Sequence, residues 1–297
     1  MTGHYTRTGT TLSFLPAFGF EPEQNYMVRV SVGLVEPTLV RFRIAAEGLI
    51  RTAAVTDFYP SGETLPENTL RFYIHFSVPM MPHVAFDYIT LKDALDTDDD
   101  SAFMQFKQEL WNEDRTRLTV LIDPGRIKRK VATNTERGPA LLAGRKYTLS
   151  VDGGWPSADG LSVLPAFDKS FLVSDALRSL PDTRMWTANA PCADTRDPLT
   201  ISFDRPFDRH SLIRALRVET QTMQRIEGEV QITDAEHSWI FTPHKAWPPI
   251  DLQVVTDPSL EDVAGNNFRD LLDHVAGSQE ADPSPTNLPI SMNECAH

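Results

Sequence analysis

The sequence predicts an all-β fold of tandem β-sandwich modules, and three observations support this prediction. The 297 residues include 22 prolines and 15 glycines, with few long runs of helix-forming residues, and this composition favours short strands and turns. Apolar and polar side chains alternate over many short segments, as half-buried strands require. Two of these patterns also recur along the chain, which indicates a repeated module.

The clearest strand pattern lies in the segment LRFYIHF, residues 70–76. Leu70, Phe72, Ile74 and Phe76 fall on one face of an extended chain, and the residues between them fall on the other. This alternation is typical of a strand with one buried face. Comparable strand patterns lie at 12–14, 26–32, 40–44, 118–122, 147–151, 199–203, 230–232, 239–241 and 252–255.

Two motifs repeat along the chain. The segment FSVPM at 76–80 matches FDRPF at 203–207, because in both a strand pattern ends in Phe-x-x-Pro and a large apolar residue. An apolar-x-apolar-x-Pro pattern occurs at 12–16, 120–124 and 239–243, and a further strand pattern follows each copy. Proline suits these strand ends because it has no N–H to donate to a ladder.

The repeats divide the chain into modules. We expect a partial module at 1–51, complete modules at 52–174 and 181–276, and a flexible tail at 277–297, which is rich in polar residues and proline. Half a sandwich would expose an apolar sheet face and open strand edges. We favour a native start further upstream; the alternative is that the half-module packs on its neighbour or on another chain.

These motifs resemble those of bacterial Ig-like domains of the S-layer type, the SbsA-like class. In that family a strand ending in F-S-x-P-M opens the module, and a Y-x-x-x-V strand followed by D-x-x-G-N closes it. Here FSVPM at 76–80, YTLSV at 147–151 and DVAGN at 262–266 match these motifs. The resemblance implies tandem Ig-like modules outside the cytoplasm, in the periplasm or at the cell surface, although the first residues lack a secretory-signal pattern.

Charge and cysteine content exclude several classes of protein. A formal net charge of −13 argues against nucleic acid or an anionic membrane as a general partner, because both require a basic field. The sequence has no run of about 18 apolar residues for membrane insertion. Its two cysteines, Cys192 and Cys295, exclude a disulfide framework and a Cys-x-x-Cys metal site but leave a bond between them open.

Turn-forming residues follow the closing strand of each complete module. Asp262 can accept hydrogen bonds from backbone N–H groups, Gly265 can adopt positive φ, and Asn266 tolerates the left-handed region. Asp159 and Gly160 occupy the equivalent place in the preceding module. We expect structural turns here, with a calcium or ligand role as the alternative.

An acidic run has some of the character of a calcium loop. Asp96, Asp98 and Asp100 provide carboxylates at positions 1, 3 and 5 of such a loop. Ser101 and Lys107 stand where the loop needs a glycine and a bidentate glutamate. We therefore expect a solvated acidic loop, with weak calcium association as the alternative.

A second candidate metal site follows the strand pattern at 70–76. Met80, Met81 and His83 combine thioether and imidazole groups, which suit copper. Methionine is also a common filler of apolar cores, and the F-S-x-P-M motif supplies Met80 without any metal. We expect a structural role, with copper binding as the alternative.

The basic residues gather mainly in one loop. Arg126, Lys128, Arg129 and Lys130 lie close together in a chain that is otherwise acidic. They can either receive an anionic glycan, a phosphate or an acidic protein surface, or keep a sheet edge from pairing. Trp155 is expected in an exposed Gly-Gly-Trp-Pro loop, where it could anchor a glycan or a protein.

The sequence carries no recognised catalytic motif, whether nucleophile elbow, zinc-binding helix or phosphate loop. We therefore expect a non-catalytic structural, adhesion or binding protein of the bacterial cell envelope, without a cofactor and with a protein or glycan partner. The alternatives are a copper- or calcium-binding envelope protein and, third, a glycan-active hydrolase whose two carboxyl groups meet only in space.

Overall fold

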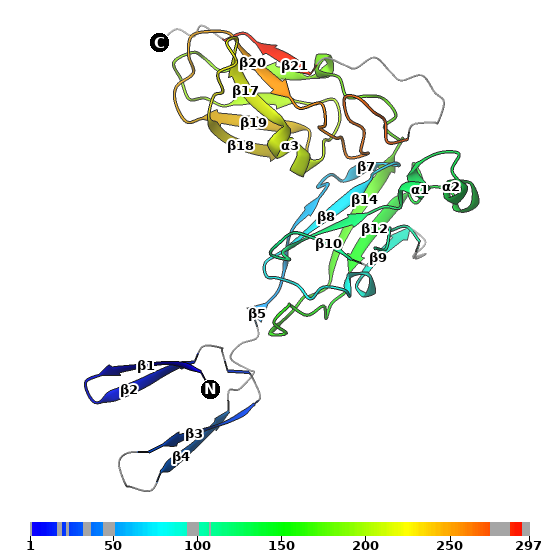
Figure 1. Ribbon diagram of the computed structural model, residues 1–297. Coiled ribbons are helices and arrows are strands. Elements are labelled where there is room, and N and C mark those ends of the chain that lie inside the picture. Colours follow the sequence, from blue (N-terminus) through cyan, green and yellow to red (C-terminus); the bar gives the residue numbers. More distant parts are fainter. Residues whose placement is uncertain are drawn as a thin grey trace.

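The described residues of the computed structural model form two β-sandwiches and two N-terminal β-hairpins (Figure 1). The structure describes residues 2–16, 20–21, 24–31, 37–43, 51–93, 101–106, 108–273 and 286–292. Strands dominate and the helices are short, so the predicted all-β class with tandem sandwiches is confirmed. Among the described residues, no helix is long and apolar enough to cross a membrane.

The first sandwich packs two four-stranded sheets face to face. One sheet has the order β10 (Leu110–Trp111), β11 (Arg117–Leu121), β8 (Arg71–Phe76), β6 (Val55–Tyr59). The other has the order β7 (Thr64–Pro66), β14 (Phe167–Ser174), β12 (Lys146–Val151), β9 (Ile89–Asp93). A parallel pair, β5 (Arg51–Thr52) with β13 (Ser162–Val163), lies beside them. The short helices are η2 (Ala85–Asp87), α1 (Pro124–Ile127) and α2 (Ala132–Arg137).

The alternation in β8 produces the core of this sandwich. Phe72 and Ile74 are fully buried, and they lie opposite Val120 and Leu118 of β11. The opposite face of β8 differs from expectation, because Tyr73 is 7% exposed rather than solvated. The second sandwich covers this face.

The second sandwich has one four-stranded and one three-stranded sheet. The larger has the order β15 (Thr187–Asn189), β16 (Leu199–Ser202), β19 (Ser238–Pro243), β18 (Gly228–Thr233). The smaller has the order β17 (Leu216–Thr220), β20 (Leu252–Thr256), β21 (Asn287–Ile290). Two short helices, η3 (Thr183–Met185) and α3 (Arg209–Ala215), complete it.

Strand β21 corrects, for residues 287–290, the prediction of a flexible tail at 277–297. It pairs antiparallel with β20, and Ile290 is buried in the core of the second sandwich. The sequence did not predict this strand, because Pro289 and the polar residues before it are typical of disordered segments. Proline is compatible with this position because β21 lies at the edge of its sheet.

The N-terminal residues form two separate two-stranded sheets. Strand β1 (Gly3–Thr8) pairs with β2 (Thr11–Pro16), and β3 (Asn25–Val30) pairs with β4 (Thr38–Arg43). Figure 1 shows both hairpins apart from the sandwiches, beyond β5. Among the described residues, neither hairpin contributes to the two hydrophobic cores.

The structure shows whether Cys192 takes part in a disulfide bond. Cys192 is disulfide-bonded. The other cysteine of the chain, Cys295, lies outside the described residues. The sequence had left such a bond open.

Candidate functional site

The outer face of β8 meets the second sandwich in a polar junction. The Tyr73 hydroxyl donates to Asp208 Oδ2 at 2.7 Å, and Arg71 forms an ion pair with Glu261. Just before β8, the Leu70 N–H donates to the carbonyl oxygen of Val263 at 2.9 Å. Strand β8 therefore packs on its own core with one face and binds the neighbouring sandwich with the other.

Two further contacts extend this junction. Glu236 is 2% exposed and accepts hydrogen bonds from both the N–H and the hydroxyl of Ser61, each at 2.8 Å. Leu177, in the link between the sandwiches, accepts hydrogen bonds from the Asn68 amide at 2.7 Å and the Asn266 amide at 3.0 Å. Each sandwich thus holds the link with one asparagine.

A pair of histidines stacks across the same boundary. The rings of His75 and His210 lie 5.4 Å apart and nearly parallel, with 3.3 Å between their Nε2 atoms. Arg117 lies 3.2 Å from His210 Nδ1, and a guanidinium can only donate. His210 Nδ1 is therefore the acceptor, which leaves the Nε2–H of neutral His210 to donate to His75.

Burial and charge keep both histidines neutral. Burial, followed by the charge of Arg117, lowers the pKa of His210 to about 4. Burial also lowers the pKa of His75, with Asp57 opposing and Arg117 and Arg209 adding to the effect. A protonated His75 would place two Nε2–H groups against each other beside a guanidinium, so acid opposes this contact.

The turn at 262–266 lies between the sandwiches. Asp262 accepts hydrogen bonds from the Ala264 N–H at 2.9 Å and the Asn266 N–H at 3.0 Å, and Arg205 lies 3.5 Å away. Burial raises the pKa of Asp262 to about 6, although these contacts oppose the shift. Gly265 has φ of +80°, and an added Cβ would stand 2.6 Å from Leu70 Cδ2. The turn therefore positions the junction as well as closing its module.

The junction leaves little empty space. The cavity between Tyr59, Tyr73, Asp208 and Arg209 has a volume of about 10 Å³, which is near the minimum that holds one water molecule. A substrate cannot enter such a space. The arrangement joins two sandwiches and leaves no cleft for chemistry at this position.

Two arginines of the basic loop bind partners within the same chain. Arg126 is 4% exposed, and its guanidinium donates to the carbonyl oxygens of Gly138 and Pro139 at 2.6 and 3.1 Å. Arg129 Nε lies 2.6 Å from Asp273 Oδ2 in an ion pair. Asp273 of the same chain therefore supplies an acidic group that binds this loop. Lys128 is half-buried and Lys130 is exposed.

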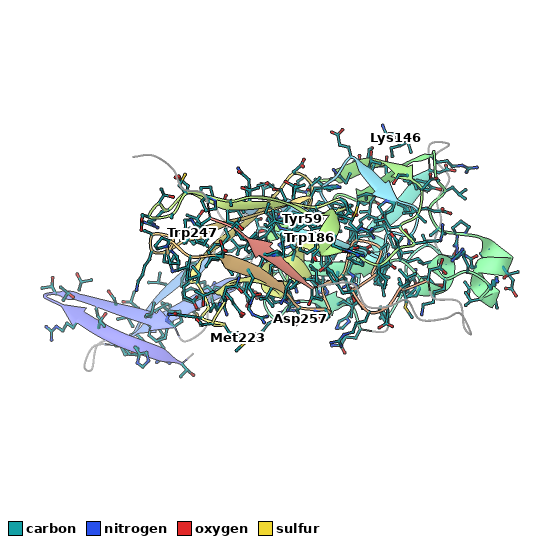
Figure 2. The ribbon with its side chains drawn as sticks, turned by 90° about the horizontal axis from the view of Figure 1, so that it is seen from above. Tyr59, Lys146, Trp186, Met223, Trp247 and Asp257 are labelled. Atoms are coloured by element: carbon teal, nitrogen blue, oxygen red, sulfur yellow. The ribbon has the colours of Figure 1, made fainter. Side chains whose placement is uncertain are left out.

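Trp155 corrects the prediction of an exposed anchor. Its side chain is fully buried, and its ring stacks on Tyr88 with centroids 5.4 Å apart and contacts Phe76 edge to face. Its Nε1–H donates to the Met81 carbonyl oxygen at 3.0 Å. Proximity to glycine and proline suggested a surface loop, but the loop folds inward and the indole completes the core. Figure 2 labels Trp247, which is buried in the second sandwich in the same way.

The three candidate copper ligands differ in their exposure. Met80 is fully buried, Met81 is half-buried, and His83 is exposed. No group of three His, Cys, Asp or Glu side chains within the described ranges can hold a metal. The acidic run with Asp96, Asp98 and Asp100 lies outside the described residues.

The second turn that the sequence singled out is exposed. Asp159 accepts hydrogen bonds from the Ser157 hydroxyl at 2.6 Å and the Leu161 N–H at 3.0 Å. Gly160 has φ of +71°, and nothing lies within 4 Å of the position of an added Cβ. This turn has the same local chemistry as the turn at 262–266, but a side chain at Gly160 would enter open space whereas one at Gly265 would meet Leu70.

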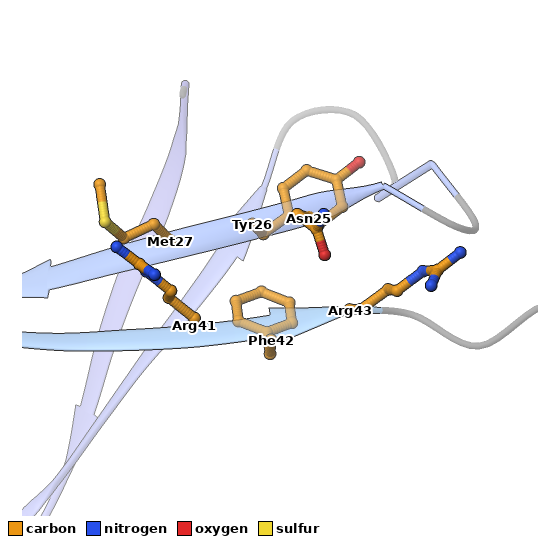
Figure 3. A pocket seen from close by; sticks show the side chains of 6 residues that line it. All are labelled: Asn25, Tyr26, Met27, Arg41, Phe42 and Arg43. Atoms are coloured by element: carbon orange, nitrogen blue, oxygen red, sulfur yellow. The ribbon is translucent and has the colours of Figure 1, made fainter.

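The β3–β4 hairpin carries an open surface. A cavity of about 500 Å³ lies against the end of the hairpin away from its turn, and Figure 3 shows the lining residues Asn25, Tyr26, Met27, Arg41, Phe42 and Arg43. The rings of Tyr26 and Phe42 stack with centroids 5.6 Å apart. Aromatic faces beside arginines are suited to sugars, anionic groups and protein interfaces.

Sequence reasoning missed the junction residues. Tyr73 and His75 belong to the predicted polar face of β8, and His210 stands in a helix of the other module. The one signal was that this face carries aromatic rings rather than small polar groups. Such amphipathic side chains suit an interface between two domains, but their partners lie 135 residues away.

No protein-family model and no curated protein matches this sequence. Similar solved structures include the N-terminal part of the bacterial S-layer protein SbsC, with 11% identity over 70% of this chain and 41% of that chain and a TM-score of 0.30. The Escherichia coli alpha-2-macroglobulin domains MG0-NIE-MG1 have 9% identity over 71% of this chain and 68% of that chain, with a TM-score of 0.27. The chicken CNTN1 FN1–FN3 domains have 16% identity over 92% of this chain and 79% of that chain, with a TM-score of 0.22. At these TM-scores the similarities carry no argument about function.

Proposed function

We propose that this chain is a non-catalytic structural or adhesion protein of the bacterial cell envelope, built from Ig-like modules of the S-layer, SbsA-like type. The observation that carries the proposal is that apolar side chains are exposed on both faces of the β1–β2 hairpin. Tyr5 and Leu12 lie on one face and Leu15 on the other, and they are between 66% and 70% exposed. A two-stranded hairpin is marginally stable in water, so these exposed apolar side chains favour contact with a partner.

The junction supports the structural part of the proposal. Its polar groups, among them Tyr73, Asp208 and Glu236, are occupied by contacts between the sandwiches, and its cavity admits no substrate. Two sandwiches joined in this way form one stiff body, which suits a structural role. The disulfide at Cys192 supports a location outside the cytoplasm, where such bonds persist.

Fractionation of the source cells tests this proposal. The full-length protein should remain with the envelope fraction, whereas a Leu12→Asp/Leu15→Asp variant should shift to the soluble fraction by at least tenfold. Met223→Asp is the matched control, because Met223 is 78% exposed on the second sandwich and should leave the distribution unchanged. Recovery of the wild-type protein in the cytosol would overturn the proposal.

A glycan partner is a second candidate, favoured by the cavity on the β3–β4 hairpin. Asn25, Arg41 and Arg43 lie on the same face of this hairpin, an arrangement that can bind an anionic group and hydrogen-bond a sugar. Titration with an anionic polysaccharide such as a uronic-acid polymer should give binding that Arg41→Glu weakens at least fivefold. Equal binding by wild type and variant would exclude this site.

A further inference from the structure

The second sandwich carries a cavity where the edges of its two sheets meet. Strands β17 and β18 are edge strands of different sheets and do not pair with each other. A cavity of about 320 Å³ lies beside them, lined by residues of α3, β17, β18, β19 and the connection between β17 and β18. Its volume is at the lower end of the range for small-molecule pockets, roughly 300–1,000 Å³.

The floor of this cavity is the edge of the hydrophobic core. Leu216 and Phe241 are 5% and 4% exposed and belong to that core. Ile226 and Val230 pack against it and are half-buried, and Val230 lies directly opposite Phe241 in the sheet. An apolar group that enters the cavity therefore extends the core and is removed from water.

Every charged residue that lines the cavity is an arginine, namely Arg214, Arg217 or Arg225. Arg217 pairs through Nε with Glu219. Arg225 pairs in the same way with Glu227, and neither glutamate lines the cavity. Among the described residues, the exposed Arg214 side chain makes no hydrogen bond or ion pair. The cavity thus has a positive rim in a chain whose net charge is −13.

The strand edges beside the cavity are partly occupied by the protein itself. On the β17 side, the Ile226 N–H donates to the Val218 carbonyl oxygen at 2.9 Å. On the β18 side, Arg209 Nη1 donates to the Ile232 carbonyl oxygen at 3.2 Å, and α3 packs beside this strand (Figure 1). An extended peptide would need such backbone groups in order to add as a strand, whereas a small ligand does not.

We propose that this cavity binds a small amphipathic carboxylate, of the kind that a medium-chain fatty acid represents. Its apolar tail lies against Leu216 and Phe241, and its carboxylate binds Arg214, because the planar guanidinium matches a carboxylate in a two-pronged contact. An uncharged or cationic ligand would leave the arginine rim without a partner. This site goes beyond the proposed envelope function and does not depend on it.

Isothermal titration calorimetry of the full-length protein with decanoate tests the proposal. Decanoate should bind saturably and at least tenfold more tightly than decyltrimethylammonium, which has the same apolar tail and the opposite charge. Octanoate should bind more weakly than decanoate by on the order of tenfold, because each buried methylene group contributes about fourfold to the affinity.

The charge of the rim is tested by two arginines in matched positions. Arg214→Gln should weaken decanoate binding at least fivefold, and Arg214→Lys, which keeps the charge, should weaken it less. Arg137→Gln is the control and should bind like the wild type. Arg137 is likewise exposed and lies in the last turn of the short helix α2, as Arg214 does in α3, so both changes remove the same interaction with a helix end.

The apolar part of the site is tested by two isoleucines of the same sandwich. Ile213 lines the cavity and is 46% exposed, so Ile213→Ser should weaken decanoate binding about threefold without disturbing the core. Ile250 is 48% exposed and does not line the cavity. Ile250→Ser should therefore leave the affinity unchanged.

Several outcomes would overturn the proposal. They are the absence of saturable binding, equal affinity for decanoate and decyltrimethylammonium, and equal binding by the wild type and Arg214→Gln. A peptide with a free C-terminal leucine that binds at least tenfold more tightly than decanoate would replace the small ligand with a protein terminus. If Arg214→Gln fails to fold, the ligand series and Ile213→Ser still decide the matter. Cell fractionation, which tests the proposed function, is independent of all these results.

Discussion

The Tyr73 hydroxyl donates a hydrogen bond to Asp208 Oδ2 at 2.7 Å across the boundary between the two sandwiches. Asp208 Oδ1 also accepts from the Ser211 N–H at 2.8 Å, so the same carboxylate caps helix α3. Burial, together with the nearby Asp208 carboxylate, raises the pKa of Tyr73 and keeps it protonated as the donor. One side chain thus couples the junction to local structure in the second sandwich.

Replacement of Tyr73 by phenylalanine should weaken this coupling. The change removes one hydroxyl and leaves a buried carboxylate oxygen without its donor, which costs about 2 kcal/mol. Urea unfolding should show this loss in the free energy of unfolding. Thr148→Ala is the control, because its hydroxyl bonds Ser170 at an exposed position and its loss should cost at most about 0.5 kcal/mol. Equal losses in the two variants would contradict a special role for Tyr73.

The two turn glycines provide a matched pair. Gly160 and Gly265 have φ values of +71° and +80°, so alanine at either position costs about 1 kcal/mol in backbone strain. At Gly265 the new Cβ would also stand 2.6 Å from Leu70 Cδ2, which adds roughly 1–3 kcal/mol of overpacking.

Thermal or urea unfolding should therefore show a larger loss for Gly265→Ala than for Gly160→Ala. The difference between the two variants measures the close packing of the turn against the first sandwich, because the strain is common to both. Identical losses would mean that Leu70 moves aside without cost and that the junction tolerates the extra methyl group.

Stability should fall in mild acid because of the histidine pair. His210 has a pKa of about 4 in the folded protein against an ordinary value of 6.5, so the unfolded chain holds more protons between these pH values. The contribution is fully present above pH 6.5 and is lost as pH falls toward 4. His210 is partly exposed, and solvent screening reduces the loss to on the order of 1 kcal/mol.

Comparison with His210→Gln isolates this effect from other titrating groups. Asp262, whose pKa rises to about 6 from 3.8, acts in the opposite direction, because its stabilisation grows as pH falls through that range. Urea unfolding at pH 7 and pH 4.5 should show a smaller acid loss in His210→Gln than in the wild type. His244→Gln, at an exposed position, should behave as the wild type does.

The sequence predicted the strands well because a strand buried on one face has apolar residues at every second position. Phe72 and Ile74 show this alternation in β8, and Leu199 and Ile201 show it in β16. The contacts of the junction produce no comparable pattern in the sequence. The role of Tyr73 depends on where helix α3 of another module lies, and that position follows from the packing of two complete domains.

The burial of two candidate ligand-binding residues could not be predicted for a related reason. Trp155 and Arg126 have side chains that serve a ligand or a core equally well, and their local sequence contains turn residues in both cases. Only the surrounding fold distinguishes the two roles: Tyr88 stacks on the indole, and the carbonyl oxygen of Gly138 accepts from the guanidinium.

The basic loop gives the last prediction, because two adjacent residues in it have different surroundings. The Arg129 side chain and backbone N–H both donate to Asp273, at 2.6 and 2.7 Å, and Arg178 holds the same carboxylate at 3.1 Å. Arg129→Glu places a second negative charge against the buried Asp273 side chain, which is 3% exposed. Because the Arg129 side chain is 49% exposed and Arg178 still pairs with Asp273, the loss should be roughly 1–2 kcal/mol.

Lys130→Glu makes the same change of charge one residue further on, where the side chain is exposed, and it should alter stability by at most about 0.5 kcal/mol. Urea unfolding of the two variants therefore separates local structure from general charge. Raised salt should rescue Arg129→Glu only in part, because the Asp273 carboxylate is buried and screening acts weakly on buried groups. If both variants lose the same free energy, the overall field of the loop matters and the contact with Asp273 does not.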